Sequence, residues 1–244
     1  MPNILTTRNY KLDKSKGNDV ATVGISLAPV TKGGGRSMCP NAGTCAKFCL
    51  DGTGRNITGA AHAARIRRTQ FWQRDPKGFV EAVSEEIRRE QRKAEANGMT
   101  LAVRANILSD QALLALMLAK RHPDLQFYDY TKLPFSWARM RGNYHLTYSL
   151  DTHNHAEARR AMAQGVNVAV AFDVGRGGEL PERWTLPGES HTRPVLDGDA
   201  NDLRYHDPAG HIVGLRFKGS KDKRRAAVQA GFVFDPTIIT TQAA

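Results

Sequence analysis

In the second half of the chain, segments with two different patterns of hydrophobic and polar residues alternate. Short apolar, β-branched runs are followed by segments in which apolar residues recur with the period of an amphipathic helix. The predicted strands are 101–107, 125–131, 144–150, 166–173, 193–196, 211–217 and 231–234, and the predicted helical segments are 109–120, 134–141, 154–164 and 220–230. A polar, proline-containing insertion at 175–191 interrupts the alternation. Such alternation predicts βαβ units around a parallel sheet.

The first hundred residues add one strand and two helices. The strand is predicted at 20–29, where Pro29 stops it, and the helices at 59–74 and 77–97. Between the strand and the first helix, residues 30–58 form a long glycine-rich segment. Glycines in such a segment let the backbone approach a cofactor closely.

The whole pattern predicts a single α/β domain over residues 20–244, after a polar lead-in at 1–19 that holds a short strand at most. Seven or so strands suit a partial or complete (β/α) barrel, and a doubly wound open sheet is the alternative. Neither an internal repeat nor a convincing domain boundary is visible in the sequence.

The three cysteines of the chain, Cys39, Cys45 and Cys49, lie together in the glycine-rich segment. Their odd number excludes a fully paired disulfide framework, and their spacing differs from the Cys-x2-Cys pairs of common structural zinc sites. Thiolates that converge on one loop suit a soft metal centre. We therefore expect three ligands of an iron–sulfur cluster, with one iron left without a cysteine.

Two alternatives to the cluster remain open. Zinc could be bound by the three cysteines together with Asp51 or His62, because four ligands would complete a tetrahedron. The cysteines could also be buried thiols without any role as ligands. A Ser-His-Asp order and an HExxH motif are both missing from the sequence, so we reject hydrolase-triad and metalloprotease functions.

Composition bears on location and partners. The chain has 41% hydrophobic residues and a formal net charge of +11. Its basic residues are spread over several segments, which suits solvated helix faces as well as a surface for nucleic acid or another polyanion. With no apolar run of about 18 residues and no apolar leader, we expect no membrane span. Cysteines that serve as metal ligands also favour a reducing cytoplasm.

Polar residues follow the predicted strands at their carboxyl ends, where sites of parallel α/β folds form. They are Asn106, Ser109 and Asp110; Asp129, Tyr130, Thr131 and Lys132; Ser149, Asp151 and His153; Asp173; Asp197, Asp199 and Asp202; and Arg216, Lys218 and Ser220. Ser109, Asp110 and Asp151 could instead cap helices. Lys132 ends a strand and precedes Pro134, which is a poor place for a purely solvated lysine.

Several motifs together resemble a bacteriophage family called gene product 88. They are Cys-Pro-Asn-Ala-Gly-x-Cys-Ala-Lys-x-Cys at 39–49, Val-Arg-x-Asn at 103–106, the run 119–132, Asp-Gly-Asp-x-x-Asp at 197–202 and Gly-Leu-Arg-x-Lys-Gly at 214–219. The resemblance covers roughly residues 20–235 and implies a phage or prophage origin, and hence a location in the cytoplasm of the host cell.

The layout is also similar to that of radical S-adenosyl-L-methionine (AdoMet) enzymes, in which three cysteines follow the first strand of a partial α/β barrel. The resemblance implies a [4Fe-4S] cluster on Cys39, Cys45 and Cys49. The candidates that it implies for AdoMet or substrate binding are Asn106, Asp110, Ser149 and Asp151, which Lys132 joins by its place at a strand end. Two features depart from that superfamily: the cysteine spacing is x5 then x3, and Ala-Asn-Ile-Leu at 105–108 replaces Gly-Gly-Glu.

Two functions follow as expectations. The first is a radical-AdoMet-like enzyme that takes an electron from a host flavodoxin or ferredoxin and acts on a nucleic acid or a nucleotide-related substrate. The second is a non-enzymatic iron–sulfur or zinc protein that binds nucleic acid.

Overall fold

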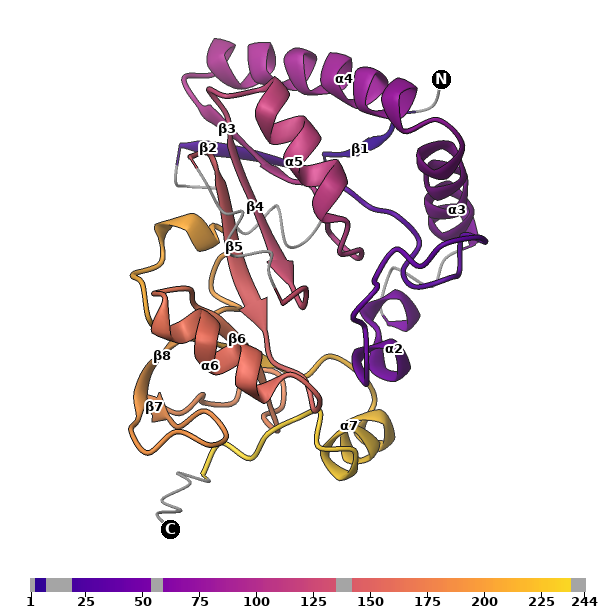
Figure 1. Cartoon of the computed structure of the whole chain (residues 1–244). Helices are drawn as coiled ribbons and strands as arrows, with labels where there is room; N and C mark the ends of the chain where they lie inside the picture. The colour runs from indigo at the N-terminus through magenta and orange to yellow at the C-terminus, as the bar shows by residue number, and fades with distance from the viewer. Residues whose placement is uncertain (1–2, 8–18, 54–58, 135–141, 238–244) are drawn as a thin grey trace.

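The computed structural model of the protein describes residues 3–7, 19–53, 59–134 and 142–237, and its nine strands form one sheet (Figure 1). The strands are β1 (Leu5–Thr6), β2 (Val20–Ile25), β3 (Thr100–Arg104), β4 (Gln126–Thr131), β5 (Tyr144–Ser149), β6 (Val168–Phe172), β7 (Arg183–Trp184), β8 (Arg193–Asp197) and β9 (Ile212–Arg216). The helices are α2 (Cys45–Phe48), α3 (Gly59–Arg74), α4 (Pro76–Ala96), α5 (Ala112–Arg121), α6 (His155–Ala163) and α7 (Lys221–Gln229), with 3-10 turns η1 (Leu50–Gly52) and η4 (Arg204–His206).

The sheet is mainly parallel and open. Its strand order is β1-β2-β3-β4-β5-β6-β9-β8-β7, and every pair from β2 to β8 is parallel. The two-residue strands β1 and β7 pair antiparallel at its edges. The predicted mixed α/β fold is thus confirmed, whereas the described residues do not form a complete barrel, because these two edge strands do not pair with each other.

The helices between successive strands pack on the sheet beside the strands that they connect. Helix α4 contacts β1, β2 and β3, α5 contacts β4, and α6 contacts β5 and β6. Since chain order and spatial order agree from β2 to β6, right-handed crossovers place these helices on one face. Beyond β6 the order reverses, because β9 lies next to β6 and the earlier strand β8 lies outside β9. An open sheet with such a reversal agrees with the doubly wound alternative.

Helix α4 illustrates how the sequence specifies one of these elements. Asp75 caps it by accepting a hydrogen bond from the backbone N–H of Gly78, and Pro76 occupies the first turn. Gly98, with a φ of 68°, follows its end. Phe79 and Ile87 are both fully buried in the core that α4 and α5 share with the sheet.

The opposite face of the sheet is covered by the segment between β8 and β9. Leu203 of this segment joins a small core with Val20 of β2 and Tyr128 of β4. Beside it, Asp202 lies 2.7 Å from the guanidinium of Arg104, and both side chains are buried. Both faces of the central strands are therefore covered.

Three segments in the second half of the chain differ from their predicted structure or lie outside the described residues. The insertion at 175–191 is not entirely irregular, because it contains β7 and the buried Trp184, whose side chain packs on Phe172. Residues 231–234 form a single bridge, between Phe234 and Phe172, in place of the expected last strand. The helical turn expected at 134–141 lies almost wholly outside the described residues.

The other predicted elements agree with the structure to within a few residues at their ends. The division between a lead-in at 1–19 and a domain at 20–244 stays a prediction, although β1 pairs with β2 within the part that is described. No helix in the described part of the chain is long and apolar enough to span a membrane.

Candidate functional site

A cavity of about 240 Å³ opens at the carboxyl ends of the parallel strands. One wall is the cysteine loop, by which we mean residues 30–53. The opposite wall, called the strand-end wall, is formed by residues 104, 106–110 and 130–132, at the carboxyl ends of β3 and β4. Ser149, Ala171, residues 215–218 and Phe232 complete the lining. The cavity thus lies where parallel α/β folds place their sites.

All three cysteines line this cavity. Each is a free thiol and half-buried. The Cys39 thiol donates to the backbone oxygen of Leu108 at 3.5 Å, and the Cys49 sulfur accepts from the backbone N–H of Asp51 at 3.5 Å. Cys45 begins α2, a four-residue helix that the sequence pattern did not predict.

The surroundings of Cys39 and Cys45 favour the protonated form of these two thiols. Burial raises the pKa of Cys39 to about 12, and the nearby thiolates of Cys49 and Cys45 add to the increase. Burial also raises the pKa of Cys45, against which the positive charge of Lys132 acts. Because a metal binds thiolates, binding to these cysteines would release protons and would strengthen as the pH rises.

Residues at the end of β5 hold the first part of the cysteine loop. The buried carboxylate of Asp151 accepts a hydrogen bond from the backbone N–H of Cys45 at 3.1 Å. The hydroxyls of Thr152 and Thr44 are 2.7 Å apart. The ring of His153 lies so close to Gly43 that a Cβ there would be 2.1 Å from it. Asp151 therefore positions Cys45 from behind the cavity, which it does not line.

The end of the cysteine loop is held by aromatic packing and one lysine. Phe48 of α2 stacks on Phe232 with ring centroids 5.6 Å apart, and Phe217 lies edge-on to it at 6.3 Å. The ammonium of Lys223 in α7 donates to the backbone oxygen of Cys49 at 3.2 Å. The three phenylalanines also line the cavity, and our sequence analysis did not identify them. The Phe-Cys pair at 48–49 could have indicated the first of them.

Asp51 and His62, proposed above as a fourth zinc ligand, have other surroundings. The buried Asp51 carboxylate is 2.7 Å from the guanidinium of Arg65 and 2.9 Å from the ammonium of Lys32. His62 lies 3.9 Å from the same carboxylate, and neither Asp51 nor His62 lines the cavity. The ion pairs of Asp51 thus connect the cysteine loop to α3 and do not point to a ligand role.

The donor chemistry of the site suits a soft metal centre, because three free thiols face one cavity. Within the described ranges, however, no group of three or more His, Cys, Asp or Glu side chains is placed to hold a metal ion. The assignment of the three cysteines as ligands therefore stays a prediction.

A buried hydrogen-bond network shapes the strand-end wall at Asn106. Its side-chain oxygen accepts from the Ser109 hydroxyl at 2.8 Å and from the Gln111 backbone N–H at 2.9 Å. Its backbone N–H and side-chain amide both donate to Asp129, which also accepts from the hydroxyl of Tyr144. Burial raises the pKa of Asp129 to about 7, against the effect of these hydrogen bonds.

Asp110 links the two strands of this wall. It accepts hydrogen bonds from the Thr131 hydroxyl and the Lys132 backbone N–H, each at 2.8 Å. Its own backbone N–H donates to Met38 in the cysteine loop. The alternative in which Ser109 and Asp110 cap a helix is wrong, because α5 begins at Ala112 and these side chains bond to the β3 and β4 ends instead.

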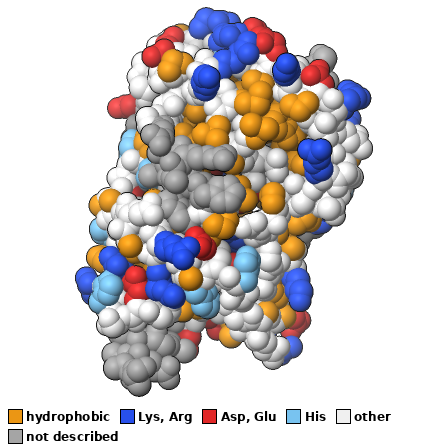
Figure 2. All heavy atoms as spheres, in the orientation of Figure 1, with side chains coloured by type: hydrophobic (Ala, Val, Ile, Leu, Met, Phe, Trp, Pro, Cys, Tyr) orange, Lys and Arg blue, Asp and Glu red, His pale blue; other side chains and the backbone are white. Residues whose placement is uncertain are grey.

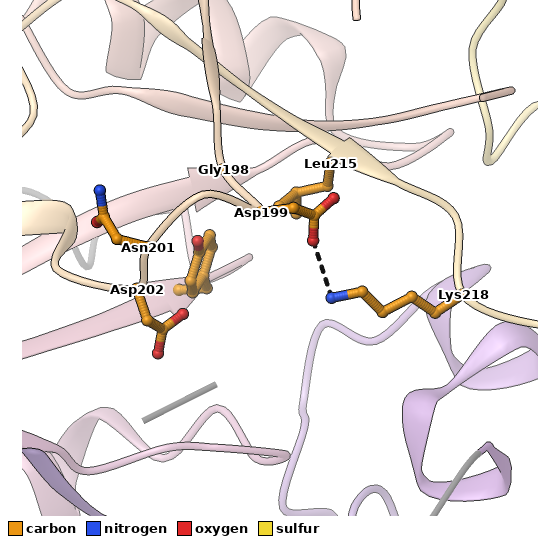
Figure 3. A pocket seen from close by; sticks show the side chains of 7 residues that line it. Gly198, Asp199, Asn201, Asp202, Leu215 and Lys218 are labelled. Carbon is orange, nitrogen blue, oxygen red and sulfur yellow. Dashed lines mark ion pairs between the residues drawn. The ribbon is translucent and has the colours of Figure 1, made fainter. Parts of the chain in front are cut away.

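Of the proposed binding residues, Asn106, Asp110, Lys132 and Ser149 line the cavity. The other polar strand-end residues mostly pair with one another or with basic groups. A smaller hollow beside the main cavity is lined by Tyr130, Gly198, Asp199, Asn201, Asp202, Leu215 and Lys218 (Figure 3). Asp173 is paired with Arg224 at 3.1 Å, and Ser220 caps α7.

Comparison with known proteins gives one family. The family model described as Gene product 88 matches residues 3–235. We found no match among the curated proteins and none among the solved structures. Because the family model covers nearly the whole chain, the protein belongs to the Gene product 88 family, the bacteriophage family that its motifs resemble.

Proposed function

We propose that Cys39, Cys45 and Cys49 hold a [4Fe-4S] cluster and that the protein is a radical-AdoMet-like enzyme. One observation carries this proposal: the chain's three cysteines line the same cavity as the polar ends of β3, β4 and β5. Such a cluster would supply an iron without a cysteine ligand and an electron for the cleavage of bound AdoMet.

The arrangement of strands supports the proposal. The cysteine loop follows β2, and the parallel strands β2 to β6 then succeed one another in chain order. The same order, with the cysteines after the first strand, is what the resemblance to radical AdoMet enzymes implies for a partial barrel. The unusual cysteine spacing places Cys45 at the start of α2, where Asp151 holds its backbone.

The chain's own residues would bind and orient the reactants. Phe48, Phe217 and Phe232 form an apolar part of the lining that excludes water. Asn106 and Ser109 bond to each other, so they keep a fixed geometry on the strand-end wall. This is the contribution that a protein makes to cofactor chemistry, since the cofactor supplies the reactivity.

We propose a nucleotide-related substrate or a nucleic acid, with a host flavodoxin or ferredoxin as the electron donor in the host cytoplasm. The net charge of +11 favours an anionic partner. On the face that Figure 2 shows, Lys and Arg side chains are scattered over several elements and do not form a single patch.

Anaerobic purification followed by ultraviolet–visible and EPR spectroscopy tests the proposal. We expect a brown protein with iron and sulfide, and a reduced EPR signal that changes when AdoMet is added. Cys45→Ser should lose the cluster, whereas Lys47→Ala, an exposed change on the same helix that leaves the cavity lining intact, should keep it.

The outcomes separate the parts of the proposal. A colourless protein with bound zinc would exclude the cluster, and full iron and sulfide content in Cys45→Ser would refute the ligand assignment. A cluster whose EPR signal does not change when AdoMet is added would contradict the radical-AdoMet-like enzyme and favour the second candidate function.

The second candidate is a non-enzymatic iron–sulfur or zinc protein that binds nucleic acid, which the basic net charge favours. Here the metal centre would order the cysteine loop without chemistry. This candidate predicts an affinity for single- or double-stranded DNA or RNA that falls steeply between low and moderate salt. Binding that is absent at low salt would exclude it.

A further inference from the structure

We propose that Lys132 binds the anionic group, a carboxylate or a phosphate, of the ligand that occupies the cavity. The inference deepens the proposed function and rests on it for the identity of that ligand. Its basis is that the side chain of Lys132 lacks the close carboxylate that each of the other cavity cations has, while its backbone is held in place.

Among the residues that the structure describes, four cationic side chains line the cavity, and close carboxylates neutralise three of them. Arg104 is 2.7 Å from Asp202, Arg216 is 2.8 Å from Asp197, and Lys218 is 2.9 Å from Asp199 (Figure 3). An anionic ligand would have to compete with these carboxylates for the three cations. Lys132 is the remaining cation of the four.

The ammonium of Lys132 has no hydrogen-bond partner within the part of the chain that the structure describes. Its nearest carboxylate, that of Asp151, is 3.8 Å away and already accepts the Cys45 backbone N–H. The Lys132 side chain is 12% exposed and lines the cavity, so a ligand there can reach it. An anion in the cavity would gain a charge-assisted hydrogen bond from this ammonium without displacing a carboxylate that is hydrogen-bonded to it.

The backbone of Lys132, in contrast, is held by three side chains from different parts of the chain. Its N–H donates to Asp110 at 2.8 Å. Its carbonyl oxygen accepts from the Asn41 amide at 3.2 Å and from the Tyr148 hydroxyl at 3.3 Å. The position of the lysine is therefore set before a ligand binds, which reduces the entropy lost on binding.

Aromatic rings beside the ammonium suggest the shape of the ligand. The Lys132 nitrogen lies 5.9 Å from the ring centroid of Phe232, which stacks on Phe48. A ligand whose anion meets Lys132 would therefore place its remaining atoms against apolar, aromatic surface. The carboxylate of AdoMet and the phosphate of a nucleotide share this chemistry.

Calorimetric titration of the anaerobically reconstituted protein with AdoMet, and separately with adenosine monophosphate, tests the inference and distinguishes the two sources. We expect at least one ligand to bind. Lys132→Met should weaken its binding about 10- to 100-fold, because a hydrogen bond to a charged group is lost. Lys132→Arg should bind within about 3-fold of the unaltered protein, since it keeps a cation. Lys47→Met, an exposed change on α2, is the matched control.

Circular dichroism shows whether each variant is folded, and iron analysis shows whether it holds the cluster. The two measurements separate a failure of the proposed function from a failure of the inference about Lys132. If Lys132→Met does not fold, Lys132→Gln takes its place. If the unaltered protein holds no iron, the proposed function fails, but the adenosine monophosphate titration still tests Lys132. Equal affinities in the unaltered protein and Lys132→Met would overturn the inference, as would the absence of binding of both ligands at millimolar concentration.

Discussion

The two walls of the cavity are stabilised in different ways. The strand-end wall belongs to the sheet, and its polar side chains are buried in a network that runs from Asn106 to Asp129 and Tyr144. The cysteine loop instead carries α2, a helix with no buried residues, and is held by side chains from elements far along the chain.

This difference indicates which wall a bound group would stabilise. The strand-end wall is formed when the sheet folds, so its geometry does not depend on a ligand. The cysteine loop has few buried apolar contacts of its own, which is typical of segments that open locally at low cost. A metal centre bound there would stabilise mainly this loop. Substitutions in each wall should therefore have different consequences.

Asp202→Ala should lower the free energy of unfolding most. The change leaves the guanidinium of Arg104, which belongs to the strand-end wall, buried without its carboxylate partner. Breaking a buried ion pair from one side costs about 3–5 kcal/mol. Urea denaturation should show this loss in the free energy of unfolding. The double change Arg104→Met with Asp202→Leu should recover much of it, and a loss below about 1 kcal/mol for Asp202→Ala would contradict the assignment.

Asp129 should make the stability of the strand-end wall depend on pH. Its pKa rises from 3.8 to about 7 on folding because burial disfavours the carboxylate. The folded state therefore binds the proton more tightly than the unfolded state, so this stability is fully present below about pH 4. This contribution to stability decreases as the pH rises from about 4 and is lost once the pH passes 7. Each unit of difference between the folded-state and unfolded-state pKa corresponds to about 1.4 kcal/mol. Asp129→Asn cannot titrate and should lack this loss.

The measurement compares the free energies of unfolding of the unaltered protein and Asp129→Asn by urea denaturation between pH 4 and pH 8. The advantage of the unaltered protein over the variant should shrink as the pH rises. Parallel pH profiles for the two proteins would show that Asp129 does not titrate in this range.

Gly43→Ala should perturb the cysteine loop. The residue has a φ of +51°, and a Cβ there would be 2.1 Å from the His153 ring. The left-handed backbone alone costs about 1–2 kcal/mol for a residue other than glycine. Gly34 also has a positive φ, but no atom lies within 4 Å of its Cβ position, so Gly34→Ala is the control.

We expect faster amide hydrogen exchange in α2 for Gly43→Ala than for Gly34→Ala. The double change Gly43→Ala with His153→Ala should behave like the control, because it removes the clash and leaves the backbone cost. Equal exchange in the two single variants would mean that His153 does not hold the loop.

Lys223→Met should have the smallest effect, since it removes the single hydrogen bond to the backbone oxygen of Cys49 from a partly exposed side chain. The expected cost is about 0.5–1.5 kcal/mol and should be confined to the cysteine loop. Hydrogen exchange near Cys49 should rise while the midpoint of global urea unfolding stays unchanged. Lys221→Met, on the exposed surface of α7, should change neither.

Much of the fold could be predicted because local periodicity reports burial. The ranges predicted for α3, α4 and β4 agree closely with the structure. For α4 the reason is a clear apolar pattern, which buries Phe79 and Ile87, and a stop at Gly98. The strand β7 was missed because two residues within a polar segment show no period. The short helix α2 was missed because it has no buried side and is held only by tertiary contacts.

The lining of the cavity could be predicted in part, because parallel strands bring their carboxyl ends together. This rule placed Asn106, Asp110, Lys132 and Ser149 near the cysteines. It could not separate lining residues from supporting ones: Asp151 and Asp129 also follow or end strands, yet they hold other groups from behind the cavity. That distinction depends on side-chain direction and on partners elsewhere in the chain.

The sequence by itself determined the α/β class, the mainly parallel sheet and the grouping of three thiols in one segment after the first predicted strand. Only the tertiary structure decided that the sheet stays open and that Asp202 pairs with Arg104, 98 residues away. It also decided that Asp151 holds Cys45 across 106 residues. The reason is that the periodicity of a segment shows only which of its sides is buried. Contacts between residues far apart in the sequence depend on how the strands and helices are arranged in space.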